Sequence, residues 1–134
     1  MGGGDPVLSK VEKPLKIFIS GPYTAKTDEA VMVNVRKALY GGFQVSCLGH
    51  YPLVPHLNHY IDRDAQRAGY RPFSWEHWMR WCLSYLPMCD AVYSLKPSKG
   101  ADIERKFALD NDIPVYDYIH NIPMLAGYNP LEKE

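Results

Sequence analysis

Short β-rich runs alternate with helical segments along this chain, and this alternation limits its fold more than any other feature. The runs at residues 15–19, 90–95 and 113–116 are predicted as strands, and a turn and a helix follow each of the first two. The segment 74–86 carries apolar side chains at intervals of three and four residues, which is typical of a helix. Strands that alternate with helices predict a parallel sheet with helices on both faces.

Other segments give weaker signals. Thr27 is suited to cap a helix that stops at Gly41-Gly42, because glycine often follows the last turn of a helix. Residues 43–54 are predicted as one strand followed by a loop. Residues 56–73 are predicted as a long loop, and long loops are often functional.

Composition fits one folded domain and argues against several kinds of partner. The chain has 134 residues, of which 46% are apolar and 22% charged. We expect residues 1–13 to form a flexible leader and residues 14–134 a single domain. The 15 basic side chains balance the 15 acidic ones, and no apolar run reaches the ~20 residues of a membrane span. From the balanced charge and the lack of a long apolar run, we expect a protein that binds neither nucleic acid nor membrane. The three cysteines form no disulfide pattern, so we expect it in the cytoplasm.

The loop from Gly21 to Thr27 is the first candidate binding site, since it follows the first predicted strand. It superficially resembles a phosphate-binding P-loop, but Ala25 occupies the place of the required glycine and the spacing is one residue short. We therefore reject nucleoside triphosphate hydrolysis. The carboxyl end of a strand is where open α/β sheets bind ligands, so a binding loop and a simple turn both stay open.

A metal site was the second possibility. Nitrogen and oxygen ligands gather in one stretch at His50, His56, His59, Asp62 and Asp64. A His-x-x-His pair in a loop does not put both rings on one helical face, as the i, i+4 pair of a zinc protease does. We expect these histidines to make hydrogen bonds and predict no metal.

The segment from Ser98 to Glu104 is the strongest candidate. It follows a strand and opens a helix at about Gly100, so free backbone N–H groups and the positive end of the helix dipole point to the carboxyl edge of the sheet. Glu104 lies beside the face that packs on the sheet, where a carboxylate is costly unless it has partners or a task. The helix end should help to keep it ionised, as a nucleophile requires. An exposed first-turn glutamate is the other open interpretation.

Six motifs follow one another at characteristic spacing: Lys16-Ile17-Phe18-Ile19-Ser20-Gly21-Pro22-Tyr23-Thr24, Pro55-His56-Leu57, Trp78, Cys89-Asp90-Ala91-Val92, Ser98-x-Gly100-Ala101-x-x-Glu104-x-x-x-Ala108 and Ile113-Pro114-Val115. Together they resemble the nucleoside 2-deoxyribosyltransferase-like superfamily, which includes the 2'-deoxynucleoside 5'-phosphate N-hydrolases. The resemblance covers residues 15–118.

The resemblance implies a flavodoxin-like or Rossmann-like three-layer sandwich, with about five parallel strands, that cleaves an N-glycosidic bond without a metal or cofactor. A glutamate at the position of Glu104 attacks the anomeric carbon, and water or a second base resolves the intermediate, as in retaining glycosidases. A nearby aspartate usually assists the leaving base. Asp90, Asp62 and Asp64 are candidates that the sequence does not rank, and Asp90 is included in the predicted site.

The resemblance also implies where substrate binds: Ser20, Gly21, Pro22, His56, Ser98, Gly100 and Ala101. Transferases tend to carry Asp at the position of Ser98, whereas hydrolases of 5'-monophosphates carry Ser. A carboxylate there would repel phosphate, while a hydroxyl beside a helix N-terminus and Lys99 would bind it. Ser98 is also a good helix cap, and both roles are possible at once. The leading hypothesis is hydrolysis of a nucleoside 5'-monophosphate, with the deoxy form preferred.

Three residues depart from the superfamily pattern. Phe18 stands where members have a Tyr that orients the nucleophile, Cys82 where relatives often have Asp, and Asp102 where a glycine is usual. Tyr23 is the candidate to supply the missing hydroxyl. The alternatives are a deoxyribosyltransferase, a catalytically silent nucleotide-binding or sensing module, and an FMN-binding flavodoxin-like protein.

Assembly is a further implication, because active sites in this superfamily are typically completed by a neighbouring subunit. The predicted helix 74–86 cannot bury Trp75, Trp78, Trp81 and Tyr85 on one face. We therefore expect a homodimer or larger homo-oligomer with this helix in the interface.

Overall fold

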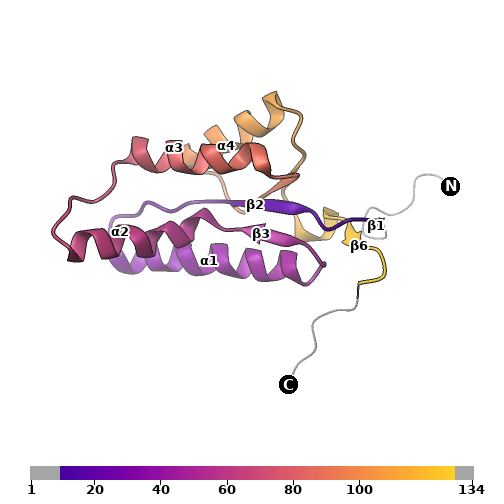
Figure 1. Ribbon diagram of the computed structural model, residues 1–134, viewed down its shortest axis with the longest axis horizontal. Helices are drawn as coiled ribbons and strands as arrows, with labels where there is room; N and C mark the ends of the chain where they lie inside the picture. The colour runs from indigo at the N-terminus through magenta and orange to yellow at the C-terminus, as the bar shows by residue number, and fades with distance from the viewer. Residues whose placement is uncertain (1–9, 129–134) are drawn as a thin grey trace, which may run out of the picture.

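Four parallel strands form the central sheet of the computed structural model, which describes residues 10–128. In spatial order they are β3 (Tyr51–Leu53), β2 (Lys16–Ser20), β4 (Ala91–Ser94) and β5 (Val115–Tyr116). Two further short strands, β1 (Lys10–Val11) and β6 (Met124–Leu125), pair in parallel beyond the amino ends of the central strands (Figure 1). The predicted parallel α/β fold is confirmed, with four strands in the central sheet instead of about five.

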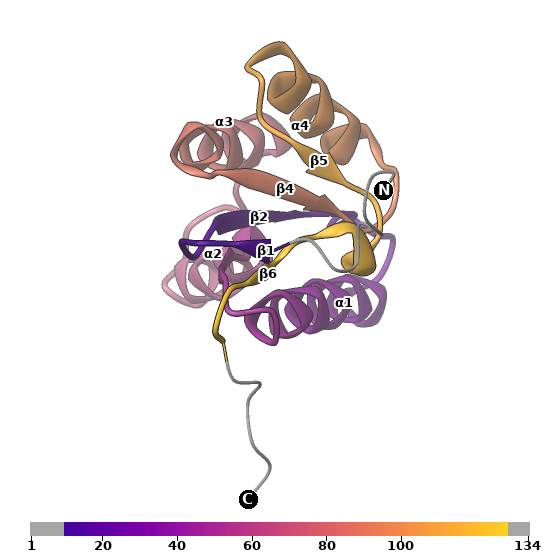
Figure 2. The ribbon, with the colours of Figure 1, turned by 90° about the vertical axis from the view of Figure 1, so that its right-hand side faces the viewer.

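Helices cover both faces of the sheet (Figure 2). The helix α1 (Asp28–Ser46) lies on one face with α2 (Asn58–Arg67) nearby, while α3 (Trp75–Tyr85) and α4 (Lys99–Asp110) lie on the other. Short 3-10 turns add η2 (Pro55–Leu57), η3 (Leu86–Met88) and η4 (Ile119–Asn121). None of the helices in the described part of the chain is long and apolar enough to cross a membrane.

The strand β2 shows why the sheet needs two covering layers. Ile17 and Ile19 pack in the core on the α1 side, whereas Phe18 between them packs with Trp78 and Ala108 on the α3 and α4 side. Successive strand side chains point to opposite faces, and all three β2 side chains are fully buried. Phe18 is therefore a core residue.

Hydroxyl side chains cap three of the four α-helices within residues 10–128, and two of them, Thr27 and Ser98, were expected to do so from the sequence. Thr27 accepts from the backbone N–H of Ala30 at 3.1 Å, and Ser74 accepts from His77 at 3.0 Å. Ser98 accepts from the backbone N–H of Ala101 at 3.0 Å. The starts of α1, α3 and α4 are thus fixed by short-range chemistry that the sequence shows directly.

The predicted end of the first helix is wrong. The helix α1 continues through Gly41 and Gly42 to Ser46, so residues 43–46 are helical and only the short β3 follows. A Cβ on Gly41 would lie 3.0 Å from Leu95, and one on Gly42 would lie 3.0 Å from Val54. These glycines let α1 pack closely on its neighbours and do not end it.

The predicted long loop is also wrong, because residues 56–73 include η2 and the ten-residue helix α2. Only His59 and Asp62 of α2 are buried, so the helix has no apolar stripe that could indicate it. The leader prediction is wrong for Lys10 and Val11, which pair with β6, while residues 1–9 lie outside the described residues.

The aromatic side chains of α3 pack within the chain. Trp78 is buried, and Trp75, Trp81 and Tyr85 are partly buried, with the Trp81 indole N–H donating to the Tyr85 hydroxyl at 3.2 Å. The expectation that this helix leaves a large exposed aromatic face is wrong. Large exposed apolar side chains lie instead on α1 and α2, for example Phe43 and Ile61.

Candidate functional site

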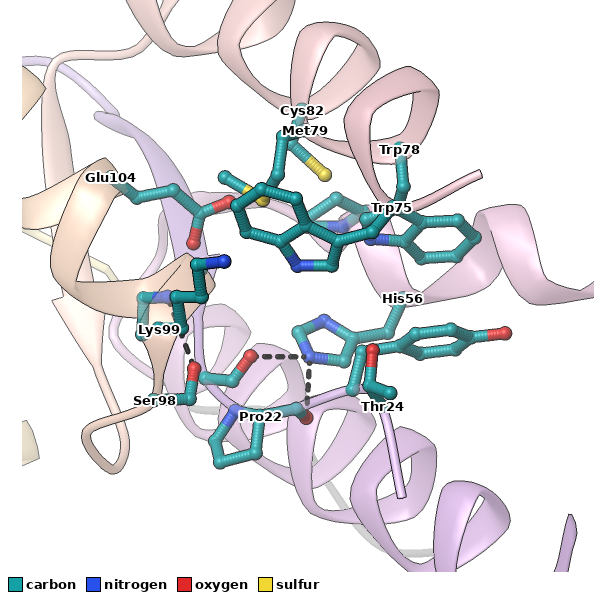
Figure 3. Close-up of a pocket in the computed structure, with 15 residues that line it drawn as sticks. Pro22, Thr24, His56, Trp75, Trp78, Met79, Cys82, Ser98, Lys99 and Glu104 are labelled. Atoms are coloured by element: carbon teal, nitrogen blue, oxygen red, sulfur yellow. Dashed lines mark hydrogen bonds between the residues drawn. The ribbon is translucent and has the colours of Figure 1, made fainter. Parts of the chain in front are cut away.

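A cavity of about 250 Å³ lies at the carboxyl edge of the sheet, where β2 and β4 are neighbours. The chain after β2 enters a helix on one face, and the chain after β4 enters a helix on the other, so the two connections separate at this point. Open α/β sheets bind ligands at such a switch point. The walls are the loop after β2, η2, the first two turns of α3 and the N-terminus of α4 (Figure 3).

The structure brings most of the predicted site together. The predicted residues that line the cavity are Gly21, Pro22, Tyr23, His56, Ser98, Gly100, Ala101 and Glu104. Ser20 does not line the cavity but donates a hydrogen bond to Glu104. Asp90 lies away from the cavity, beside the backbone of Lys16. The sequence prediction missed Trp75 and Met79, which also line the cavity. Their helical spacing indicated core packing, and nothing in that pattern distinguishes a core side chain from a cavity wall.

Glu104 is the buried carboxyl of the site. It lies in the second turn of α4 with 5% of its surface exposed, and its Oε1 accepts from the Ser20 hydroxyl at 2.6 Å. Burial raises the pKa of Glu104 to about 7, while hydrogen bonds from Ser20 and Cys82 lower it. Desolvation is the larger effect, so the helix end does not hold the pKa of Glu104 at its ordinary value, as the sequence had led us to expect.

Tyr23 does not take the predicted role of orienting Glu104. Its hydroxyl lies 2.8 Å from Nδ1 of His59, and its ring stacks on Trp78 with the centroids 4.0 Å apart. Burial raises the pKa of Tyr23 to about 12, with a further rise from the charge of Asp62. Ser20 and Cys82 occupy the positions next to the Glu104 carboxyl instead. The Tyr23 ring forms part of the cavity wall.

His56 joins two walls of the cavity. Its ring is 3% exposed, and Nε2 lies 3.1 Å from the carbonyl oxygens of both Gly21 and Pro22. Carbonyls only accept hydrogen bonds, so Nε2 is the donor. Burial lowers the pKa of His56, while these two hydrogen bonds raise it. The net effect is a neutral ring that fixes the loop after β2 to η2.

The N-terminus of α4 forms the wall next to Glu104. The Nζ of Lys99 lies 4.2 Å from the centre of the Trp75 ring, in a cation–π contact. A Cβ on Gly100 would lie 3.1 Å from Sδ of Met79, so glycine here lets α4 approach α3 closely. Lys99 has no carboxylate partner among residues 10–128. The first backbone N–H groups of a helix likewise lack intrahelical acceptors.

The three candidate aspartates do not line the cavity. Asp90 accepts from the backbone N–H of Lys16 at 2.8 Å, at the amino edge of the sheet. It was predicted to assist the leaving base, and this prediction is wrong because the residue precedes β4 whereas the cavity lies beyond its end. Asp62 accepts from Phe73 N at 3.0 Å, and Asp64 pairs with Arg67.

The histidines and aspartates considered as metal ligands in the sequence do not form a metal site. Across the part of the chain that the structure describes, no three His, Cys, Asp or Glu side chains gather where they could hold a metal ion. The cavity walls offer a buried carboxyl, hydroxyls, a neutral imidazole, a thiol and a lysine.

Fold and site together define an α/β domain with a ligand-sized cavity at the carboxyl edge of a parallel sheet. The chain belongs to the family described as a domain of unknown function, DUF4406, whose model matches residues 15–117. That range includes the four strands of the central sheet and all residues that line the cavity. A comparison with curated proteins finds no match.

Proposed function

We propose that this protein hydrolyses the N-glycosidic bond of a nucleoside 5'-monophosphate, with a preference for the deoxy form. The observation that carries the proposal is the buried carboxyl of Glu104, which is hydrogen-bonded to Ser20 and borders the same cavity as the N-terminus of α4 (Figure 3). A cavity of about 250 Å³ is close to the lower end of the ~300–1,000 Å³ of small-molecule sites. It suits one nucleotide better than a polymer.

Glu104 acts as the nucleophile in this proposal. Its carboxylate attacks the anomeric carbon and forms an ester with the sugar, while the N-glycosidic bond breaks and its electron pair leaves with the base. Water then hydrolyses the ester and releases the sugar phosphate. The base gains a proton from solvent. The Ser20 hydroxyl holds Oε1 in place through both steps.

The 5'-phosphate is assigned to the N-terminus of α4. Ser98 offers a hydroxyl, Lys99 offers a positive charge, and the backbone N–H groups of Lys99 and Gly100 point out of the first turn. Lys99 rests on Trp75 and can turn to a bound phosphate without breaking an ion pair among the described residues. A cation, a hydroxyl and amide donors are the usual phosphate ligands.

A nucleotide-binding module without turnover is the second candidate. Two observations favour it: the raised pKa of Glu104 leaves much of the carboxyl protonated at neutral pH, and the three candidate aspartates lie outside the cavity. A protonated carboxyl is a hydrogen-bond donor to a ligand and a poor nucleophile. Binding would then survive while bond cleavage fails.

The deciding experiment is chromatographic detection of free base after incubation with a panel of nucleosides and their 5'-monophosphates. Release from monophosphates supports the hydrolase. Transfer of the sugar to an added second base identifies a deoxyribosyltransferase instead. Binding without release, followed through the fluorescence of Trp75 and Trp78 in the cavity wall, identifies the binding module.

We also propose that the protein works in the cytoplasm as a homodimer or larger assembly. Its three cysteines are free, which fits a reducing compartment. Because the α3 aromatics are largely packed within the chain, they no longer support α3 as the interface. Light scattering at working concentration tests the assembly, and a monomer contradicts it.

A further inference from the structure

His56 carries a hydrogen-bond acceptor that nothing in residues 10–128 uses. Because Nε2 donates to Gly21 and Pro22, the Nδ1 of the neutral ring keeps its lone pair. This atom is buried and has no hydrogen-bond partner. Buried polar atoms are nearly always paired, so an unpaired one in the wall of a cavity indicates a group that a ligand supplies.

His50, a second buried histidine next to β3, shows the usual arrangement. His50 is 2% exposed, and its Nδ1 accepts from the backbone N–H of Leu15 at 3.0 Å. Its Nε2 bonds to the carbonyl oxygen of Pro123. Both ring nitrogens of His50 are therefore paired within the chain, and only one of those of His56 is.

The position of His56 decides which part of a nucleotide meets Nδ1. In Figure 3 the His56 ring faces Trp75 across the cavity, with Glu104 and Ser98 on the far side from His56. A nucleotide with its anomeric carbon at Glu104 and its phosphate at Ser98 extends its base toward His56 and Trp75. The sugar hydroxyls then stay on the Glu104 side.

We propose that His56 is a specificity-determining residue whose Nδ1 accepts a hydrogen bond from an N–H group of the base. This inference rests on the proposed binding of a nucleotide in this cavity. A base with only lone pairs on the facing edge meets the lone pair of Nδ1 and is repelled. A ring N–H of an oxo base, such as uracil or hypoxanthine, or an exocyclic amine supplies the missing donor.

Matched ligands test this with the unmodified protein. Uracil deoxynucleotide is compared with its N3-methyl analogue, which has lost the ring N–H, and with its 5-methyl analogue, which has gained a methyl elsewhere. Adenine deoxynucleotide is compared with its N6,N6-dimethyl analogue. We expect Kd, from tryptophan fluorescence, to rise about 10- to 100-fold on loss of the donor in at least one pair. The 5-methyl control should change Kd by about threefold or less.

A second measurement follows His56 itself. In ¹⁵N spectra of the full chain, its Nδ1 should resonate as an unprotonated imidazole nitrogen and shift when the uracil or adenine deoxynucleotide binds. The Nδ1 of His50, which already has a donor, is the matched control and should not shift. A proton on His56 Nδ1 in the free protein would overturn the inference.

The outcomes separate the inference from the proposed function. If no nucleotide binds and none releases base, the proposed function fails and the inference fails with it. If nucleotides bind or are cleaved but loss of the N–H donor leaves Kd unchanged in both pairs, only the role of His56 is overturned. His56→Phe adds an internal test, since it should remove the preference for N–H donors even where overall binding is weaker.

Discussion

Buried polar groups at the amino edge of the sheet differ from those at its carboxyl edge in how fully they are hydrogen-bonded. His50 precedes β3 at the amino edge, and His56 follows it at the carboxyl edge, and both rings are almost fully buried. His50 pairs both nitrogens with the backbone and so fixes the β1–β6 ladder to the start of β2. His56 leaves one nitrogen unpaired beside a cavity.

The carboxyl groups repeat this contrast. Asp90 at the amino edge is exposed and accepts from the backbone of Lys16, so it makes a structural bond at little desolvation cost. Glu104 at the carboxyl edge is buried, and desolvation raises its pKa to about 7. At the amino edge these polar groups have hydrogen-bond partners within the chain. At the carboxyl edge, buried polar groups whose desolvation is unfavourable remain available to a ligand.

The largest expected effect separates these two carboxyl groups. Glu104→Gln keeps the side-chain volume and the acceptor for Ser20 but removes the nucleophile, so release of base should fall by about 10⁴-fold or more. Asp90→Asn changes a carboxyl at the amino edge and should leave kcat/KM nearly unchanged. Initial rates of base release measure both. Equal losses in the two variants would contradict the assignment of the site.

The next effect tests the phosphate position at the N-terminus of α4. Aspartate is also a good helix cap, so Ser98→Asp keeps the helix start and adds a negative charge. At ~4 Å and an effective dielectric of ~20, repulsion per charge pair is about 4 kcal/mol before screening. Use of the monophosphate should fall by orders of magnitude, while use of the unphosphorylated nucleoside should change far less.

The ratio of kcat/KM for one nucleoside and its monophosphate measures the effect of Ser98→Asp. General damage to the fold lowers both values alike, so the comparison carries its own control. An unchanged ratio would leave Ser98 as a helix cap alone and remove the reason to prefer a phosphorylated substrate.

The free energy of unfolding should depend on pH because Glu104 is buried. Its pKa is about 7 in the folded chain against an ordinary value of 4.5, so between these pH values the folded state holds a proton that the unfolded chain has lost. Protonated Glu104 therefore stabilises the folded state relative to its ionised form. This stabilisation is fully present below pH 4.5 and is lost as the pH rises through about 7. At higher pH the buried charge costs about 3 kcal/mol.

Glu104→Gln removes that charge and should therefore be more stable than the natural protein at pH 8 by up to about 3 kcal/mol. The advantage should shrink as the pH falls and disappear below pH 4.5. Denaturant unfolding across this range measures it. A variant that is less stable at pH 8 would show that Glu104 holds the fold together and does not strain it.

The sequence predicted the layers because strand periodicity and helix caps are short-range signals, whereas most of the residues expected in the cavity came from the family resemblance. Thr27 and Ser98, both expected as helix caps, show this directly. The sequence prediction was wrong where contacts between distant residues determine the structure. Only the structure shows that Gly41 and Gly42 lie within α1 and let it pack closely on Leu95 and Val54. Glu104 and His56 were expected at the site and both line the cavity, but the partners of Glu104 and the position of Asp90 away from it depend on how the strands are ordered in space.

The smallest effect compares two capping serines. Ser74 and Ser98 each accept a backbone N–H at 3.0 Å, so Ser74→Ala and Ser98→Ala should each lower the free energy of unfolding by about 1 kcal/mol. Of these two serines, only Ser98 lines the cavity and offers its hydroxyl to a bound phosphate. Ser98→Ala should therefore also weaken monophosphate binding several-fold, by about 1 kcal/mol for one hydrogen bond, and Ser74→Ala should not. Denaturant titration and tryptophan fluorescence give the two quantities, and equal binding by both variants would assign the phosphate to other donors of α4.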